Sequence, residues 1–368
     1  MNILIFNWRD LKHSWAGGGE IYVFELAKRW VKAGHKVTVF CSQDPYQRLK
    51  DQEVYDGIRI IRKGGRFSLY IWAPIWYFKH LRKKTDVIVD VQNGIPFFTT
   101  LFSRRPKVSF VYHVHNKQFF YELLFPLSLV GYCIEKFIFP LFYRNVPIIA
   151  ISKTTKNELM HLGFKKENIH IVYCGISQPK ASVINKSKKF STPTLLYLGR
   201  IKAYKRVDLL IQIFSEVLKT HPLAKLILAG WGTEASSITD RVMRSSFRRR
   251  IEVMGPVSDS EKKRLLSQSW LFVNPSIGEG WSIAVIESNL YGTPAIGFNV
   301  AGLSESIKHR KTGLLARDTD DMITKINEIL HNKAYREELG KNARKWANTF
   351  SWDTASNQSL KIFKKILK

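Results

Sequence analysis

The residues best suited to chemistry lie in one stretch of the second half, Pro275–Glu287, which reads PSIGEGWSIAVIE. Glu279 stands between two glycines, and a helix is expected to begin near Ser282, so Glu287 would lie one to two turns into that helix. The backbone N–H groups of Ser282 to Ala284 would then point from a helix N-terminus at an anion. The two carboxylates could bind hydroxyl groups, one near that anion and the other farther back.

A second candidate site is basic and follows another predicted strand. Gly199-Arg200 comes just after this strand, and Lys205-Arg206 comes just before a helix expected over Val207–Lys219. An arginine can bind phosphate oxygens bidentately, whereas a lysine supplies a point charge. Two cations five residues apart across a strand-to-helix turn could therefore clamp a diphosphate. A solvated basic turn is the alternative in so basic a chain.

A glycine-rich turn, Gly17-Gly18-Gly19-Glu20, stands between the first predicted strand and a predicted helix. Consecutive glycines let the backbone approach a ligand closely, and a helix N-terminus favours anions. The dinucleotide-binding pattern GxGxxG and the P-loop pattern GxxxxGK[ST] are both missing from the sequence. The turn is therefore interpreted either as a loop that approaches a phosphate group or simply as a flexible connection.

Two histidines, His113 and His115, stand at the end of a predicted strand in the first half. Alternation along a strand would place both imidazoles on the same face of the sheet. Paired imidazoles can bind a metal, but no carboxylate or cysteine stands beside them in the sequence, so we predict no metal site. A purely structural role is the alternative for both, and more so for His115.

The elements that must position these residues have an α/β pattern. Short β-branched runs alternate with longer amphipathic stretches, which is typical of βαβ units and parallel sheets. The predicted strands are Ile3–Phe6, Lys36–Phe40, Ile58–Ile61, Asp86–Val89, Val108–Tyr112, Ile148–Ile151, Ile169–Val172, Thr194–Leu198, Lys225–Ala229, Ile251–Met254, Leu271–Val273, Pro294–Ile296 and Leu314–Ala316. We therefore expect two doubly wound α/β domains with a ligand cleft between them, at the carboxyl ends of the strands.

The expected domain boundaries follow from a change in composition. A stretch rich in Lys, Ser and Pro, without periodicity, is predicted to be a linker over residues 178–193. It separates an N-terminal domain (1–177) from a C-terminal domain (194–350). The last segment, 351–368, is expected to be an amphipathic helix that packs back toward the first domain.

Composition and charge exclude several classes of protein. The 368 residues are 45% hydrophobic and 24% charged, which excludes a disordered or collagen-like chain. The three cysteines have no CxxC or Cys/His spacing, so neither a zinc site nor a disulfide framework is predicted. The 58 Lys and Arg residues against 30 Asp and Glu give a net charge of +28, which indicates an anionic partner.

Two segments of the first half suit a membrane surface. Residues 70–84 read YIWAPIWYFKHLRKK, and residues 119–143 are rich in Phe, Leu and Tyr but interrupted by charges, so neither provides the ~20 apolar residues that span a bilayer. Aromatic side chains beside cations are typical of membrane interfaces, and anionic lipid would attract the basic residues. Core-packing helices with solvated basic faces are the alternative. No signal peptide is expected, so we predict a cytoplasmic protein, peripheral on the inner membrane face if it docks there.

The motifs together resemble a known family. GEGWSIAVIE, followed by Gly292-Thr293-Pro294, resembles the E-x7-E region of retaining GT-B glycosyltransferases, especially glycosyltransferase family 4. The supporting matches are GGGE, GRIKAYKR, LAGWGTE and VMGPVSD, which occur in the same order and cover nearly the whole chain. LAGWGTE departs from the pattern, because Trp231 stands where an Asp often separates the glycines.

The resemblance implies a GT-B fold, with the first domain on the acceptor side and the second domain binding the nucleotide-sugar donor. It also implies the retaining transfer of a hexose from a UDP- or GDP-sugar to a glycan or lipid-linked acceptor. This reaction would serve cell-envelope polysaccharide or glycolipid synthesis. Arg200 and Lys205 would bind the donor diphosphate and stabilise the leaving nucleotide. Glu279 would contact hydroxyls of the sugar, Glu287 those of the ribose, and His113 would lie beside the reactive carbon. No cofactor and no bound metal are implied.

The remaining donor contacts that the resemblance implies lie in glycine-rich turns and at a helix N-terminus. They are Gly18, Gly19, Gly255, Gly280, Ser282, Ile283 and Ala284. Two other enzyme functions, a sugar-nucleotide epimerase and a phosphorylase, would fit the same fold. A nucleic-acid-binding protein would fit the net charge, but no binding module is recognisable in the sequence, so we predict no nucleic-acid partner.

Overall fold

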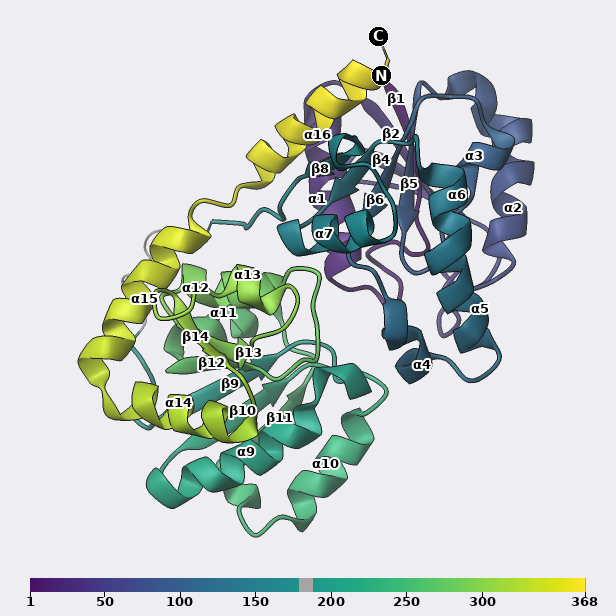
Figure 1. Ribbon diagram of the computed structural model, residues 1–368. Helices are drawn as coiled ribbons and strands as arrows, with labels where there is room; N and C mark the ends of the chain where they lie inside the picture. Colours follow the sequence, from purple (N-terminus) through teal and green to yellow (C-terminus); the bar gives the residue numbers. More distant parts are fainter. Residues whose placement is uncertain (179–187, 368) are drawn as a thin grey trace. The chain divides into compact units, whose positions relative to one another are not determined.

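The protein is described by a computed structural model that covers residues 1–178 and 188–367 (Figure 1). The chain forms two compact units. The first unit comprises Met1–Gly175 with Ser351–Lys368, and the second comprises Ile176–Phe350. Most of the expected linker lies outside the described residues. Its last part belongs to the second unit, where the Lys189 ammonium donates to the Thr293 hydroxyl at 2.6 Å.

The first unit is built on an eight-stranded sheet with the order β3-β4-β2-β1-β5-β6-β7-β8. Its strands are β1 (Asn2–Phe6), β2 (Lys36–Cys41), β3 (Gln52–Tyr55), β4 (Ile58–Arg62), β5 (Val87–Gln92), β6 (Lys107–Val111), β7 (Ile148–Ala150) and β8 (Ile169–Ile171). All pairings are parallel except that of β3 with β4. The strand order reverses beside β1, which places the loop after β1 at a topological switch point, where open α/β sheets bind ligands.

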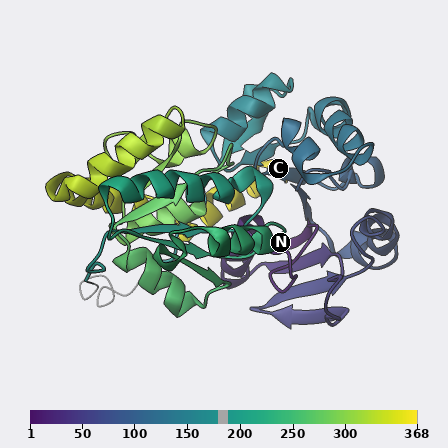
Figure 2. The same ribbon diagram turned by 90° about the horizontal axis from the view of Figure 1, so that it is seen from below.

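Helices cover both faces of this sheet (Figures 1 and 2). The helices of this unit are α1 (Gly18–Lys32), α2 (Leu69–Trp76), α3 (Thr99–Phe102), α4 (Phe119–Glu122), α5 (Leu127–Cys133), α6 (Phe139–Tyr143), α7 (Lys153–His161) and α16 (Trp352–Ile366). Alternation along β1 explains the two layers, because Leu4 and Phe6 pack in the cluster under α2. The C-terminal α16 packs on α1, where the Trp30 indole donates to the Ser359 hydroxyl at 3.0 Å.

The second unit has a six-stranded parallel sheet with the order β11-β10-β9-β12-β13-β14. Its strands are β9 (Thr194–Leu198), β10 (Lys225–Ala229), β11 (Ile251–Gly255), β12 (Leu271–Asn274), β13 (Ala295–Phe298) and β14 (Gly313–Ala316). Its helices are α9 (Val207–Thr220), α10 (Ala235–Arg244), α11 (Asp259–Gln268), α12 (Ile283–Leu290), α13 (Leu303–Ser306), α14 (Thr319–His331) and α15 (Lys333–Ala347). Leu195 and Leu196 belong to two different core clusters, one on each face of the sheet. The order reverses between β9 and β12, so their carboxyl-end loops adjoin.

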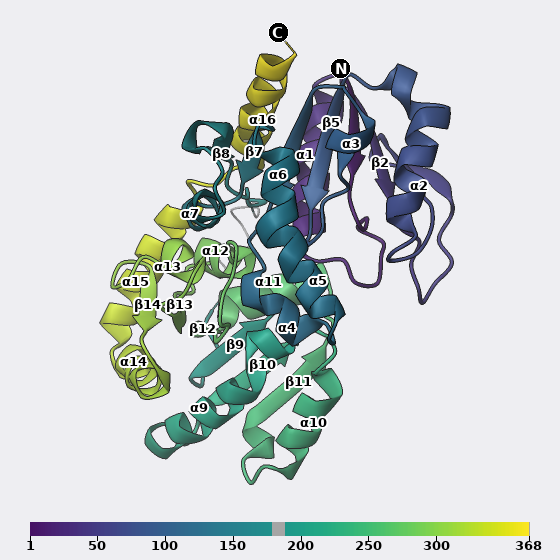
Figure 3. The same ribbon diagram turned by 45° about the vertical axis from the view of Figure 1, so that its right-hand side comes forward.

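The expected fold class, two doubly wound α/β domains, is confirmed. One strand was missed, because β3 is a mostly exposed antiparallel edge strand without an apolar run. Residues 119–143 form short helices, in which α5 and α6 are joined through η4 (Ile134–Ile138) (Figure 3). No helix among the described residues is long and apolar enough to cross a membrane.

Candidate active site

The basic turn after β9 is held by two tyrosines. The Tyr197 hydroxyl donates to the Arg200 carbonyl at 2.6 Å, and the Arg200 guanidinium donates to the Tyr204 hydroxyl at 3.3 Å. Lys205 ends a short 3-10 turn, directly before α9. The turn therefore brings Arg200 and Lys205, the two predicted phosphate-binding residues, to the carboxyl end of β9. The hydrogen bonds of the two tyrosines hold its conformation.

Lys205 forms an ion pair with Glu279, the first carboxylate of the motif. Its Nζ lies 2.5 Å from Glu279 Oε1, which also accepts hydrogen bonds of 3.0 Å from the Asn274 amide and the Ser276 hydroxyl. Burial is the largest single effect and by itself raises the pKa of Glu279, but the charge of Lys205 and the hydrogen bonds from Lys205, Asn274 and Ser276 together outweigh it and leave this pKa lowered. Burial likewise lowers the pKa of Lys205, but the combined effects of Glu279, through its charge and its hydrogen bond, and of Tyr204 outweigh burial and leave this pKa raised. Both groups are therefore charged at neutral pH.

The loop that carries Glu279 is fixed from several sides. The Glu279 N–H donates to the Ala301 carbonyl at 3.0 Å, and a Cβ at Gly302 would come within 2.0 Å of the Glu279 carbonyl oxygen. Asn274, at the end of β12, donates to Ser282 Oγ at 3.1 Å as well as to Glu279. Asn274 thus joins the carboxylate to the residue that caps α12.

The helix that follows places the second carboxylate and the predicted amides as expected. Ser282 is the N-cap of α12, so the N–H groups of Ile283 and Ala284 belong to its first turn, next to Gly280. Glu287 lies in the middle of the helix, where it forms an ion pair of 2.6 Å with Lys262 of α11. The N-terminus of α12 therefore lies between Glu279 and Glu287 along the chain.

The loops after β10 and β11 join the same sheet edge. Gly230 donates its N–H to the Gly255 carbonyl at 2.7 Å, and Ile201 donates to the Trp231 carbonyl at 2.8 Å. A Cβ at Gly232 would meet the Ile201 carbonyl oxygen at 2.1 Å. The backbone of Trp231 makes the contact with the basic turn, so this departure from the family motif leaves the joint between the two loops intact.

The glycine-rich turn of the first unit depends on a buried glutamate that sequence reasoning did not single out. Glu20, 1% exposed, accepts the Gly17 N–H at 2.7 Å and pairs with Arg9 at 3.0 Å. Gly18 and Gly19 begin α1, and the Tyr112 hydroxyl donates to the Gly19 carbonyl at 2.9 Å. The GGGE pattern carried the signal, because its acidic residue stands in the first turn of a helix.

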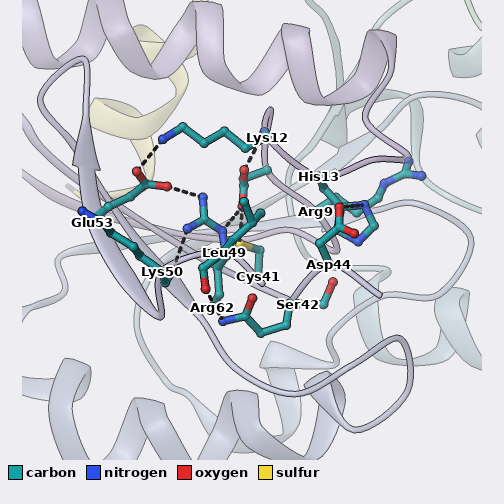
Figure 4. Close-up of polar contacts among 12 residues, drawn as sticks. Arg9, Lys12, His13, Cys41, Ser42, Asp44, Leu49, Lys50, Glu53 and Arg62 are labelled. Atoms are coloured by element: carbon teal, nitrogen blue, oxygen red, sulfur yellow. Dashed lines mark hydrogen bonds and ion pairs between the residues drawn. The ribbon is translucent and has the colours of Figure 1, made fainter. Parts of the chain in front are cut away.

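A network of buried charges fixes the loop that leads into this turn (Figure 4). Arg62, fully buried at the end of β4, pairs with Asp10 at 2.5 Å and with Glu53 at 2.6 Å. Asp44 accepts hydrogen bonds from the Ser14 and Tyr46 N–H groups. Burial alone would raise the pKa of Asp44, but these backbone bonds outweigh it and lower the pKa to about 2. The network includes the edge strand β3 through Glu53.

The two histidines lie close together, but for a different reason than predicted. β6 ends at Val111, so His113 and His115 stand in the loop beyond it, and strand alternation does not place them. Their ring centroids are 4.1 Å apart. Glu135 of η4 holds the loop, because it accepts the His115 N–H at 2.8 Å and lies 3.2 Å from His115 Nδ1. Among the described residues, no cluster of three or more His, Cys, Asp or Glu side chains could hold a metal.

A second carboxylate beside this loop, Glu158 of α7, predicts a pH-dependent stability. Burial, with Glu135 nearby, raises the pKa of Glu158 to about 7, above the ordinary value of 4.5. The folded state therefore binds this proton more tightly than the unfolded state, so stability falls as the pH rises from about 4.5 to 7. Glu158→Gln removes the charge, and we expect it to stabilise the fold on the order of 2 kcal/mol at pH 8 and little at pH 4.5.

Chemical denaturation of the two proteins at both pH values measures this difference. Glu167→Gln, which removes an exposed carboxylate of the same unit, is the matched control and should change stability equally at both pH values. An equal effect of Glu158→Gln at both pH values would contradict the raised pKa.

Two family models match the chain, one in each half. "Glycosyltransferase Family 4" matches residues 16–178, and "Glycosyl transferases group 1" matches residues 179–346. The chain is 25% identical to an uncharacterized glycosyltransferase of Methanocaldococcus jannaschii over 60% of each protein. It is 23% identical to a phosphatidylinositol N-acetylglucosaminyltransferase chain of Arabidopsis thaliana, over 96% of this chain and 79% of that protein. The chain thus matches 60% of the length of the first relative, which is less than two thirds, and 79% of the length of the second.

Solved structures share the fold over almost the whole chain. The sucrose-phosphate synthase of Thermosynechococcus elongatus superposes with a TM-score of 0.80 at 21% identity, covering 99% of this chain and 98% of that one. HepE of Anabaena, in complex with UDP-glucose, superposes with a TM-score of 0.78 at 16% identity, covering 99% and 100%. At these identities the likeness concerns the fold, and it confirms the GT-B architecture expected from the sequence.

Proposed function

Because the chain belongs to the GT-B glycosyltransferases of family 4, we propose that it transfers a hexose from a UDP- or GDP-sugar to a glycan or lipid-linked acceptor, with retention of configuration. The observation that carries this proposal is the Lys205–Glu279 ion pair beside Arg200, at the carboxyl edge of the second sheet. This group combines two fixed cations for a diphosphate with one carboxylate for sugar hydroxyls. The name of the Arabidopsis relative supports sugar transfer, and the UDP-glucose in the HepE structure supports a nucleotide sugar as donor.

Each group has a role in the proposed reaction. The bond from the anomeric carbon to the diphosphate oxygen breaks, and negative charge develops on the leaving phosphate. Arg200, Lys205 and the amides at the start of α12 would offset this charge electrostatically. The acceptor hydroxyl would attack the same face of the sugar and give its proton to the leaving phosphate oxygen. Glu279 would hold the sugar hydroxyls.

Glu287→Gln tests the donor assignment. If this carboxylate accepts hydrogen bonds from both ribose hydroxyls, the neutral amide should weaken the binding of UDP or GDP about tenfold, because charge-assisted hydrogen bonds are the stronger ones. Isothermal titration calorimetry measures the dissociation constants. Glu261→Gln, on the exposed side of α11, is the matched control and should bind like the wild type. Equal affinity of Glu287→Gln and wild type would rule out ribose binding by Glu287.

We further propose that the first unit binds an anionic membrane surface. Along α2 and the turn after it, Leu69, Ala73 and Tyr77 are buried at helical spacing, whereas Trp72 and Phe78 are exposed. The core-packing alternative therefore describes the buried side of this segment, and its exposed side carries apolar side chains in water. Exposed basic residues continue directly from it over 82–84. Such a pairing of aromatic rings and cations favours an interface with anionic lipid.

The segment 119–143 repeats this pattern and strengthens the proposal. Leu124 is 87% exposed and Phe125 79% exposed, and Phe137 and Leu141 are also exposed large apolar residues. Lys136 lies among them, with its ammonium 5.5 Å from the ring centroid of Phe137. Two exposed apolar stretches with cations on one unit are more than the scattered single residues that ordinary surfaces carry.

Flotation with phosphatidylglycerol vesicles tests the membrane proposal. We expect the protein to float with these vesicles at low salt and to remain below with phosphatidylcholine vesicles, since the attraction depends on charge. The double substitution Trp72→Glu with Phe78→Glu should abolish flotation. Leu223→Glu, at an exposed apolar position of the second unit, is the matched control and should float normally. A wild-type protein that does not float with phosphatidylglycerol vesicles would contradict the proposal.

A further inference from the structure

The first unit contains a cavity that none of the donor residues lines. Its volume is about 340 Å³, at the lower end of the range for small-molecule sites, which is ~300–1,000 Å³. Its walls come from the loop after β6, from the α5–η4 run and from α7. The lining residues are Val114, Asn116, Tyr132, Glu135, Lys136, Glu158, His161 and Leu162.

The cavity adjoins the loop that carries the predicted catalytic histidine. Val114 and Asn116 belong to this loop, two carboxylates hold it, and His113 directly precedes the cavity wall. Glu135, 2% exposed, accepts the Asn116 N–H at 2.7 Å, and Glu158 accepts the Val114 N–H at 3.3 Å. A ligand in the cavity would therefore touch the backbone and the carboxylates that set the position of the histidine loop.

The charges of the lining groups select the kind of ligand. Glu135 and Glu158 disfavour an anion, which distinguishes this site from the basic turn of the second unit. Lys136 partly offsets them, with its ammonium 2.9 Å from the Tyr132 hydroxyl, so a free cation is not strongly favoured either. In a chain with a net charge of +28, a nearly balanced cavity fits a neutral ligand.

The remaining groups narrow this neutral ligand to a polyhydroxylated ring. Carboxylate and amide oxygens accept hydrogen bonds from hydroxyl groups, and the Asn116 amide can also donate. The raised pKa of Glu158, about 7, means that a fraction of this side chain can donate a proton in a hydrogen bond near neutral pH. Tyr132, Leu162 and Val114 supply the apolar surface on which the C–H face of a sugar packs.

We infer that this cavity binds a pyranose ring of the acceptor glycan, beside the loop that carries His113. The inference rests on the proposed function, because it takes the acceptor to be a saccharide or to end in one. It assigns Glu135 and Glu158 to the acceptor site, and it places the determinant of acceptor choice in the α5–η4 run and α7.

Saturation-transfer-difference NMR on the full chain tests this inference, with UDP or GDP present. The probes are the methyl glycosides of glucose, galactose, mannose and N-acetylglucosamine, with methylammonium and inorganic phosphate as charged alternatives. We expect at least one glycoside to bind. At pH 8, where most of Glu158 is ionised, Glu158→Gln should weaken it about tenfold, because a hydrogen bond to a charged group is lost. His161→Trp, which fills the cavity from an exposed position, should abolish binding.

The controls separate this inference from the proposed function. Glu167→Gln should bind glycosides like the wild type, and all variants should bind the nucleoside diphosphate equally well. Glycoside binding that His161→Trp and Glu158→Gln leave unchanged would overturn the site. A nucleotide that binds while no glycoside does would overturn the inference and leave the donor assignment standing. Binding of phosphate or methylammonium alone would overturn the ligand class, and glycoside binding lost in His161→Trp supports the cavity whether or not a nucleotide binds.

Discussion

Lys205→Ala is expected to slow sugar transfer about 10²-fold, because it removes a cation aimed at the charge that develops on the leaving diphosphate. Lys205 Nζ lies 2.5 Å from Glu279 Oε1, so the position of the ammonium is fixed before the donor binds. Such preorganised charge is worth more in a partly buried site than in water. Steady-state kinetics with the preferred nucleotide sugar should place most of the loss in kcat.

The controls for this variant address folding and charge. Glu279 keeps the hydrogen bonds from Asn274 and Ser276, so we expect the second unit to stay folded, and thermal denaturation checks this. Lys219→Ala, at an exposed position on α9, removes the same charge from the surface and should leave kcat unchanged. A folded Lys205→Ala variant with wild-type kcat would remove Lys205 from the reaction. Arg200→Ala should behave as Lys205→Ala does.

Gly232→Ala is expected to abolish donor binding by displacing the basic turn. A Cβ at this position would lie 2.1 Å from the Ile201 carbonyl oxygen, and backbone atoms cannot rotate away as a flexible side chain can. Ile201 follows Arg200 directly, so the displacement reaches the predicted phosphate-binding group. Overpacking typically costs ~1–3 kcal/mol, and we expect a loss at the upper end in the stability of the second unit.

Titration with UDP and GDP, together with urea denaturation, measures both consequences. Gly65→Ala is the matched control, because a Cβ there meets no atom within 4 Å and the backbone is not left-handed. It should leave nucleotide affinity and stability close to the wild type. A Gly232→Ala variant that binds nucleotide normally would show that the contact between the two loops does not position Arg200.

Two buried strands of the second sheet could be predicted from the sequence to the residue, whereas β5 of the first sheet extends three residues beyond the predicted Asp86–Val89. Thr194–Leu198 and Lys225–Ala229 coincide with β9 and β10, because a strand buried on both faces is a continuous apolar run. Gln52–Tyr55 has no such run and becomes a strand only by pairing with its neighbour. Its role is also long-range, since Glu53 pairs with Arg62 in the buried network.

The motif residues could be placed on their elements, but their partners could not. Glu279 and Lys205 are 74 positions apart, and only the adjacency of β9 and β12 brings them together. Glu135 lies 20 positions after His115, so no carboxylate stands near the histidines in the sequence, and only the fold brings Glu135 to them. Strand alternation does not place His113 and His115, because β6 ends at Val111, and their proximity comes from the loop instead.

The measurement that tests the central claim most directly is the slow hydrolysis of nucleotide sugars without an acceptor, followed by NMR. The donors to compare are UDP-glucose, UDP-galactose, UDP-N-acetylglucosamine and GDP-mannose. We expect one of them to release its nucleoside diphosphate and a free sugar that first appears as the α-anomer, and we expect Lys205→Ala to suppress the release. Release of the β-anomer first would contradict retention, and no binding or release with any donor would contradict the proposed transferase.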